Sequence, residues 1–167
     1  MKHRVEIRRA KRGIAGTEYN KVINKAVSAV LRAEGVETPC SISVLITDDE
    51  GIREINRDFR GVDRPTDVLS FPALELTPGD FSFDPADTEP DTGFLPLGDM
   101  AVSAPRIRAQ AEEFGNTETR ELAYMTIHSV LHLLGYDHVD EGEQKKLMRS
   151  REKAILREAG YGGEEEK

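Results

Sequence analysis

The most informative stretch of this sequence is Thr126-Ile-His-Ser-Val-Leu-His-Leu-Leu-Gly-Tyr-Asp-His138, which holds three of the chain's four histidines. His128 and His132 are four residues apart, so on a helix their side chains lie on the same face. Gly135 follows where a helix commonly ends in a left-handed residue, a conformation that glycine adopts without penalty. The chain can then turn back and bring His138 to the same point. The pattern therefore predicts a metal site with three histidine ligands.

Three imidazole ligands suit a catalytic zinc ion, which typically has three protein ligands and an open fourth position for a water of lowered pKa. Imidazole also binds nickel, copper and iron, so the pattern indicates a metal more strongly than it indicates zinc. Asp137 or Glu121 is expected to accept a hydrogen bond from a ligand N–H. The alternative is that His128 and His132 are core histidines and His138 is an unrelated surface residue. The spacing makes this alternative the weaker one.

Length and composition predict a single folded domain. A chain of 167 residues can bury a real core, and 38% hydrophobic with 32% charged residues is typical of a folded protein. We find neither a membrane-length apolar stretch nor a signal peptide, and the single Cys40 fits a reducing, cytoplasmic location. We predict a catalytic domain over residues 1–160, with an acidic loop insertion at 73–95 and a flexible acidic tail at 161–167.

The net charge of −8 at first argues against a nucleic-acid partner. Its distribution changes this conclusion. Residues 73–99 carry seven acids and no Lys or Arg, residues 164–167 add a net −2, and the remaining body is left at +1. The first twelve residues carry six basic side chains against one acid. Global charge therefore does not decide whether the chain binds nucleic acid, and local basic patches do.

Hydrophobic periodicity predicts strands alternating with helices. We expect strands at residues 4–9, 41–46, 67–71 and 98–103. We expect helices at residues 18–34, 47–59, 105–114, 117–134 and 141–159. This order indicates an α/β fold with a small mixed four-stranded sheet. The helix at 117–134 is apolar on all sides, so we expect it to be the buried, central, metal-binding helix.

Arginines mark a second candidate functional segment. On the predicted helix that ends near residue 59, Arg53, Arg57 and Arg60 align away from the apolar stripe, and Arg64 follows in the turn. Guanidinium groups bind phosphate in a fixed fork and stay charged at physiological pH. A solvated charged face is the ordinary interpretation of such a helix. Here the helix leads directly into Arg60-Gly-Val-Asp-Arg-Pro-Thr-Asp-Val-Leu-Ser-Phe-Pro72.

That segment and His128-Ser-Val-Leu-His-Leu-Leu-Gly-Tyr-Asp-His138 closely resemble the bacterial YbeY family of ribosomal-RNA maturation factors. Leu97-Gly-Asp-Met-Ala-Val-Ser103 is similar to the family's middle signature. The resemblance runs from the second strand to the last helix and implies an α/β fold with a zinc-protease-like (zincin-like) local layout. It implies a metal-dependent, single-strand-specific endoribonuclease for small-subunit rRNA 3′-end maturation and ribosome quality control. The implied partners are single-stranded RNA, the small ribosomal subunit and its assembly factors.

Site residues follow from the resemblance by position. The implied ligands of one zinc ion per chain are His128, His132 and His138. Arg60 is the implied catalytic or phosphate-binding arginine, and it would stabilise charge that develops on the phosphate. Weaker candidates for binding the RNA strand are Arg53, Arg57 and Arg64. The resemblance gives no role to Thr66, Asp67 and Ser70. Ser129 stands where the family more usually has glycine, and the loop at 73–95 is longer than typical.

Two other functions stay open at this stage. A metallopeptidase would share the histidine pattern, but its general base is a glutamate beside the first histidine, and Ser129 in that place cannot take the proton. An assembly factor with a structural metal would bind RNA without cleaving it. For an endoribonuclease, the sequence leaves open whether water or the RNA 2′-hydroxyl attacks the phosphate.

Overall fold

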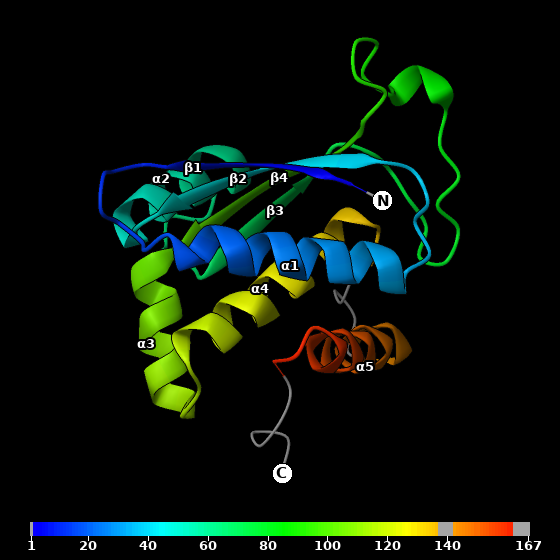
Figure 1. The fold of residues 1–167 in the computed structure, drawn as a ribbon. Helices are drawn as coiled ribbons and strands as arrows, with labels where there is room; N and C mark the ends of the chain where they lie inside the picture. The colour runs from blue at the N-terminus through cyan, green and yellow to red at the C-terminus, as the bar shows by residue number, and fades with distance from the viewer. Residues whose placement is uncertain (1, 137–141, 162–167) are drawn as a thin grey trace.

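The structure, a computed structural model, describes residues 2–136 and 142–161. Its strands are β1 (Arg4–Arg9), β2 (Cys40–Thr47), β3 (Val68–Pro72) and β4 (Leu95–Ser103). Its helices are α1 (Glu18–Ala33), α2 (Asp49–Arg60), α3 (Ala104–Phe114), α4 (Glu118–Leu133) and α5 (Glu143–Glu158), with a short 3-10 turn, η1, at Pro85–Asp87. These elements, drawn in Figure 1, confirm the predicted α/β fold class. The predicted metal helix matches α4 to within one residue at each end.

The strands form one mixed sheet in the order β1-β2-β4-β3. β2 runs parallel to both β1 and β4, and β3 pairs antiparallel with β4 at the edge. β4 begins at Leu95, earlier than the predicted start at residue 98. Leu95 and Pro96 already pair with Cys40 and Ser41, ahead of a register shift in β2. Pro96 and Gly98 hid this pairing from a reading based on strand propensity.

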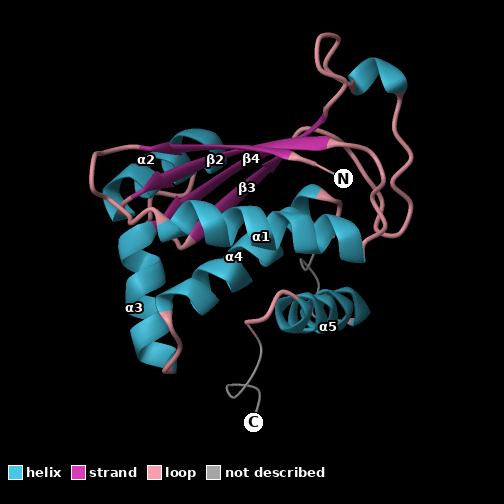
Figure 2. Ribbon diagram, in the orientation of Figure 1, coloured by secondary structure: helices cyan, strands magenta, loops and turns pink. Residues whose placement is uncertain are grey.

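Helices cover the two faces of the sheet unequally (Figure 2). The main core joins one face to α1, α3, α4 and α5. A small second cluster of Ile52, Leu69 and Ala101 lies between the other face and α2. α4 contacts α1, α3, α5, β3 and β4, and its non-histidine sides are largely buried. It is therefore the central helix, as its apolar composition predicted.

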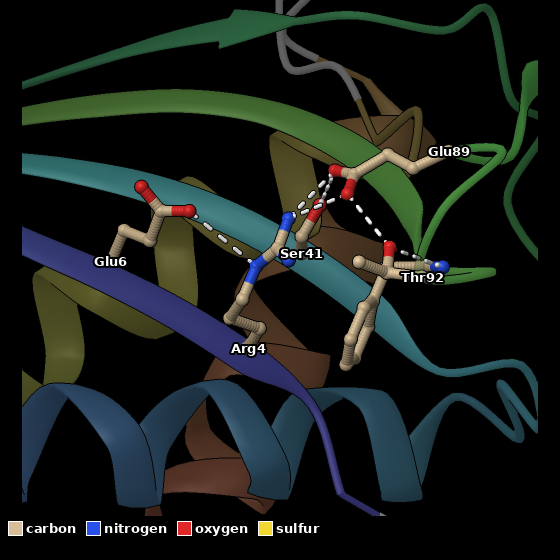
Figure 3. A network of polar contacts seen from close by, with 6 residues as sticks. Arg4, Glu6, Ser41, Glu89 and Thr92 are labelled. Atoms are coloured by element: carbon tan, nitrogen blue, oxygen red, sulfur yellow. Dashed lines mark hydrogen bonds and ion pairs between the residues drawn. The ribbon is translucent and has the colours of Figure 1, made fainter.

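The acidic segment between β3 and β4 is anchored to the sheet, as Figure 3 shows. Arg4 on β1 donates two hydrogen bonds to the Glu89 carboxylate, at 2.7 and 2.8 Å. Thr92 and Ser41 donate to the same carboxylate, at 2.8 and 3.2 Å. These donors, Arg4 first, lower the pKa of Glu89. The Arg4 guanidinium also lies 4.8 Å from the centroid of the Phe94 ring. The loop is therefore tied to β1 and β2.

The last described residue, Tyr161, packs back on the domain. Its carbonyl accepts a hydrogen bond from Arg120 Nε at 2.8 Å, and its ring lies 5.1 Å from the ammonium of Lys25. The rest of the predicted acidic tail, residues 162–167, is outside the described residues. Within the described part of the chain, no helix is both long and apolar enough to cross a membrane.

Candidate metal centre

Local sequence signals set both ends of α4. The Thr117 side chain accepts a hydrogen bond from the backbone N–H of Arg120 at 3.1 Å and so caps the first turn. At the other end Gly135 has a φ of 103°, and the N–H groups of Gly135 and Tyr136 return to carbonyls of the last turn. A Cβ at Gly135 would lie 2.1 Å from the Leu76 carbonyl oxygen. Glycine is thus required here by conformation and by close approach.

The helix brings His128 and His132 together. Their Nε2 atoms are 3.2 Å apart, and their ring centroids are 4.7 Å apart. Tetrahedral zinc with Zn–N bonds of about 2.0–2.1 Å requires two ligand nitrogens about 3.3 Å apart. The pair therefore fits two positions of a zinc coordination shell. The third predicted ligand, His138, lies outside the described residues, as does Asp137.

A buried carboxylate from α5 orients the first histidine. Nδ1 of His128 donates to Oε2 of Glu152, whose side chain is only 4% exposed. The Tyr124 hydroxyl donates to the other carboxylate oxygen at 2.7 Å. Burial and the Glu152 carboxylate raise the pKa of Tyr124, so its hydroxyl keeps its proton. With Nδ1 bonded to an acceptor, His128 carries its proton there and leaves Nε2 available to a metal.

Glu121, which the sequence offered for that supporting role, makes a different contact. Its carboxylate accepts a hydrogen bond from the Asn116 side chain at 3.4 Å. Burial, more than any other cause, raises the pKa of Glu121. Glu152, a residue that the sequence analysis missed, supports His128 instead. The sequence does hold a signal for Glu152. It falls between Met148 and Ile155 on the core-facing side of α5, where a glutamate needs hydrogen-bond partners.

The Ser129 side chain points into the protein. It is fully buried, and its hydroxyl is 2.6 Å from the Ser70 hydroxyl on β3. This contact gives Ser70 a role, because it ties the edge strand to the metal helix beside His128. The serine at this position, where the resemblance implies glycine, is therefore accommodated by a hydrogen bond.

Asp67 fixes the start of β3. Its Oδ1 accepts hydrogen bonds from the backbone N–H of Val68 at 2.7 Å and from the Thr66 hydroxyl at 3.2 Å. Its Oδ2 accepts one from Gln110 on α3 at 3.1 Å. The motif residues without a predicted role thus position the strand that connects the arginine segment to the metal helix.

Arg60 is the last residue of α2, on the sheet face opposite α4 (Figure 1). The helix ends there because Gly61 is left-handed, with a φ of 71°. Asn56 holds the following turn. Its side-chain amide donates to the Arg64 backbone carbonyl at 2.9 Å, and its backbone carbonyl accepts from the Val62 N–H. The Arg60 side chain is exposed and makes no hydrogen bond or ion pair with another described residue.

The other α2 arginines are paired with acids. Arg53 forms an ion pair with Asp63 at 2.7 Å, and Arg57 forms one with Asp58 at 3.0 Å. All four side chains are at least half exposed, so these pairs are weak and a phosphate can compete with them. Arg60 therefore differs from Arg53 and Arg57, which the sequence had grouped with it on one side of the helix, because those two arginines form ion pairs.

The fold and this centre define a class: a small α/β protein with a mixed sheet and a buried helix that presents paired histidines. Comparison with known proteins identifies its family. Residues 4–160 match the family described as Endoribonuclease YbeY. Endoribonuclease YbeY of Agathobacter rectalis is 44% identical over 144 residues, which cover 83% of this chain and 87% of that protein. Endoribonuclease YbeY of Clostridium botulinum is 44% identical over 148 residues, with 84% and 87% covered.

A solved structure agrees with the fold. The solution structure of a Thermotoga maritima protein superimposes with a TM-score of 0.60 at 28% identity and covers 93% of this chain and 88% of that one. This chain belongs to the endoribonuclease YbeY family. The resemblance found in the sequence motifs is thereby confirmed.

Proposed function

We propose that this protein is a zinc-dependent endoribonuclease that cleaves phosphodiester bonds of single-stranded RNA. The observation that carries the proposal is the pair of His128 and His132 Nε2 atoms at 3.2 Å, with the first ring held by the buried Glu152. Ligand histidines in metal sites commonly have their second ring nitrogen held by such an acceptor, which supports the assignment of a metal here. The names of the relatives supply the reaction class, endoribonuclease.

One zinc ion would be held by His128, His132 and His138. When bound, zinc supplies Lewis-acid polarisation of a phosphoryl oxygen or of water. Glu152 keeps the proton of His128 on Nδ1, and Tyr124 holds Glu152 from its other side. The burial of this carboxylate keeps water from competing for His128.

From the resemblance, we assign to Arg60 the binding of the phosphate and the stabilisation of the charge that develops on it during cleavage. Because α2 lies on the sheet face opposite α4, the RNA strand must pass the β3 edge of the sheet to reach both Arg60 and the histidines. A guanidinium offers two parallel N–H donors to a phosphate, and its charge does not depend on pH in the physiological range. The supporting observations are its exposure and the absence of a hydrogen bond or ion pair to it from the rest of the described chain. Arg53, Arg57 and Arg64 guide the strand more weakly, through long-range attraction of phosphates.

In the cell, we assign the enzyme to 3′-end maturation of small-subunit rRNA and to ribosome quality control in the cytoplasm. Its partners there are the small ribosomal subunit and assembly factors. These assignments rest on the resemblance of the two sequence motifs to the YbeY family. Accumulation of unprocessed small-subunit rRNA in cells that carry His132→Ala would support them, and normal 3′ ends in such cells would refute them.

The burial of Ser129 disfavours the metallopeptidase alternative. Its hydroxyl is engaged with Ser70 inside the protein, so neither its chemistry nor its direction suits a general base. A non-catalytic assembly factor with a structural metal would retain its cellular function when the open metal position is lost but would lose it when the basic face is lost.

A substrate comparison tests the proposal. Zinc-loaded protein is incubated with single-stranded RNA, with duplex RNA of the same sequence and with an unfolded protein, beside the His132→Ala variant. We expect cleavage of single-stranded RNA alone, and none by the variant. Equal RNA cleavage by the variant would point to a contaminating nuclease and refute the proposal. A 3′-cyclic phosphate on the products would identify the 2′-hydroxyl as the nucleophile, and its absence would identify water.

A further inference from the structure

A cavity lies beside His128, between α4 and α5. It is a pocket of about 130 Å³. Its lining residues are Tyr124, His128, Lys145, Met148, Arg149 and Glu152. Because His128 is part of its wall, any group that enters the pocket lies directly against the candidate metal centre. Pockets for drug-sized ligands are typically about 300–1,000 Å³, so this one suits a single small unit of a longer molecule.

The wall of the pocket is apolar at depth. Met148 is buried, and the half-buried ring of Tyr124 forms part of the surface. Glu152, the acid among the described lining residues, accepts hydrogen bonds from His128 and Tyr124, so its negative charge is already matched by donors. An aromatic ring next to a thioether offers a surface on which a nucleobase can stack.

Two cations line the same pocket from α5. Lys145 and Arg149 are four residues apart, so their side chains project from the same side of the helix. Lys145 is half-exposed and Arg149 is exposed, so both charges lie toward solvent. An apolar wall with positive charge at its rim matches a nucleotide, which carries an aromatic base and a phosphate.

We propose that this pocket binds one nucleotide of the RNA substrate, next to the phosphodiester that is cleaved. Lys145 and Arg149 contact its phosphate, and Tyr124 and Met148 contact its base. The proposal rests on the endoribonuclease function proposed above and adds a subsite from α5, a helix that the sequence analysis gave no role. Because stacking and phosphate contacts tolerate any base, the subsite strengthens binding without selecting a sequence.

The test measures RNA binding apart from cleavage. Zinc-loaded protein is titrated into a labelled, 2′-O-methylated single-stranded RNA, whose integrity is checked on a gel afterwards, and fluorescence anisotropy is recorded at several salt concentrations between about 50 and 200 mM. Each phosphate contact on a single strand contributes about 0.7 to the slope of log affinity against log salt. The Lys145→Ala/Arg149→Ala variant is therefore expected to bind more weakly, with a slope smaller by roughly 0.7 or more.

A matched control changes the same charge elsewhere on α5. Lys146 and Lys153 are exposed on this helix and do not line the pocket. The Lys146→Ala/Lys153→Ala variant is expected to keep the wild-type slope. An equal drop in both double variants would mean that only overall charge matters, and it would overturn the subsite.

The base contact is tested at Tyr124. Tyr124→Leu is expected to weaken binding by about 5- to 150-fold without changing the salt slope, because it removes stacking. Tyr124→Phe keeps the ring and is expected to keep the affinity. If wild-type protein binds and cleaves RNA while the Lys145/Arg149 and Tyr124→Leu variants bind like wild type, the subsite is refuted and the proposed function stands. If wild-type protein neither binds nor cleaves RNA, the proposed function itself falls.

Discussion

The contact between His128 and Glu152 makes a quantitative prediction about zinc affinity. Glu152 is 3% exposed and accepts hydrogen bonds from His128 Nδ1 and from the Tyr124 hydroxyl. Glu152→Gln keeps the shape of the side chain and an oxygen acceptor but removes the negative charge. The perturbation therefore acts on the orientation and basicity of His128 without removing a metal ligand.

The expected loss of zinc affinity can be taken from comparable residues that hydrogen-bond to metal ligands in other proteins. Removing such a partner typically weakens metal binding by about 10–100-fold, which corresponds to about 1.4–2.8 kcal/mol. Glu152→Gln should lie at the lower end of this range, since its amide oxygen can still accept from Nδ1. Glu152→Ala also leaves two half-buried donors without an acceptor, at up to about 1–3 kcal/mol each, and should lower the free energy of unfolding by up to about 2–6 kcal/mol.

Competition with a fluorescent zinc chelator gives the zinc dissociation constant of each variant, and urea denaturation of the metal-free proteins gives their stability. Tyr124→Phe is the control, because it removes one donor to Glu152 and leaves the bond to His128 in place. Its zinc affinity should stay within about threefold of wild type, because Glu152 influences the metal through its hydrogen bond to His128, which this variant keeps. Zinc affinity of Glu152→Gln within twofold of wild type would refute the orienting role of Glu152.

Three further predictions concern the phosphate site and the stability of the fold. Arg60→Glu should keep zinc and lower the rate of RNA cleavage by about 10²-fold or more. Arg57→Glu removes a residue already paired with Asp58 and should lower this rate by less than about tenfold. Single-turnover cleavage and metal analysis of both variants test this. Glu121 has a pKa raised above 4.5, so the folded protein holds this proton more tightly than the unfolded chain does, and the resulting stabilisation is lost as the pH rises from about 4.5 through the folded-state pKa. Glu121→Gln, which cannot ionise, should therefore raise Tm at pH 7 more than at pH 4. Calorimetry that finds the reverse order would contradict this. Arg151→Leu leaves the buried Glu34 carboxylate with Tyr136 as its one side-chain donor among the described residues. It should lower the free energy of unfolding by roughly 2–3 kcal/mol, less than for a fully buried pair because the Arg151 side chain is 33% exposed. Unchanged stability in urea denaturation would exclude a stabilising role for this pair.

Local signals explain why much of the fold could be predicted from the sequence. The ends of α4 are set by Thr117 and Gly135, which act on backbone groups within a few residues. The uniformly apolar composition of this helix correctly predicted its central position. The class of the sheet followed from the alternation of strands and helices, while the start of β4 depended on pairing with β2 and was placed too late.

Contacts between distant segments explain what the sequence did not reveal. Glu152 lies 24 residues from His128, and nothing local to either residue specifies that they meet. Arg4 and Glu89 are 85 residues apart, so the anchoring of the acidic loop was likewise invisible in composition. The α2 arginines show a different reason: periodicity aligned Arg53 with Arg60, but only the folded turn brings Asp63 to Arg53.

The central claim, that a histidine-bound zinc ion is required for cleavage of single-stranded RNA, is tested most directly by titrating zinc into metal-stripped protein while RNA cleavage is followed. We predict that activity rises from the background level and saturates at one equivalent of zinc per chain, and that His132→Ala stays inactive throughout the titration. Full cleavage by the stripped wild-type protein, or zinc-restored cleavage by His132→Ala, would contradict the account.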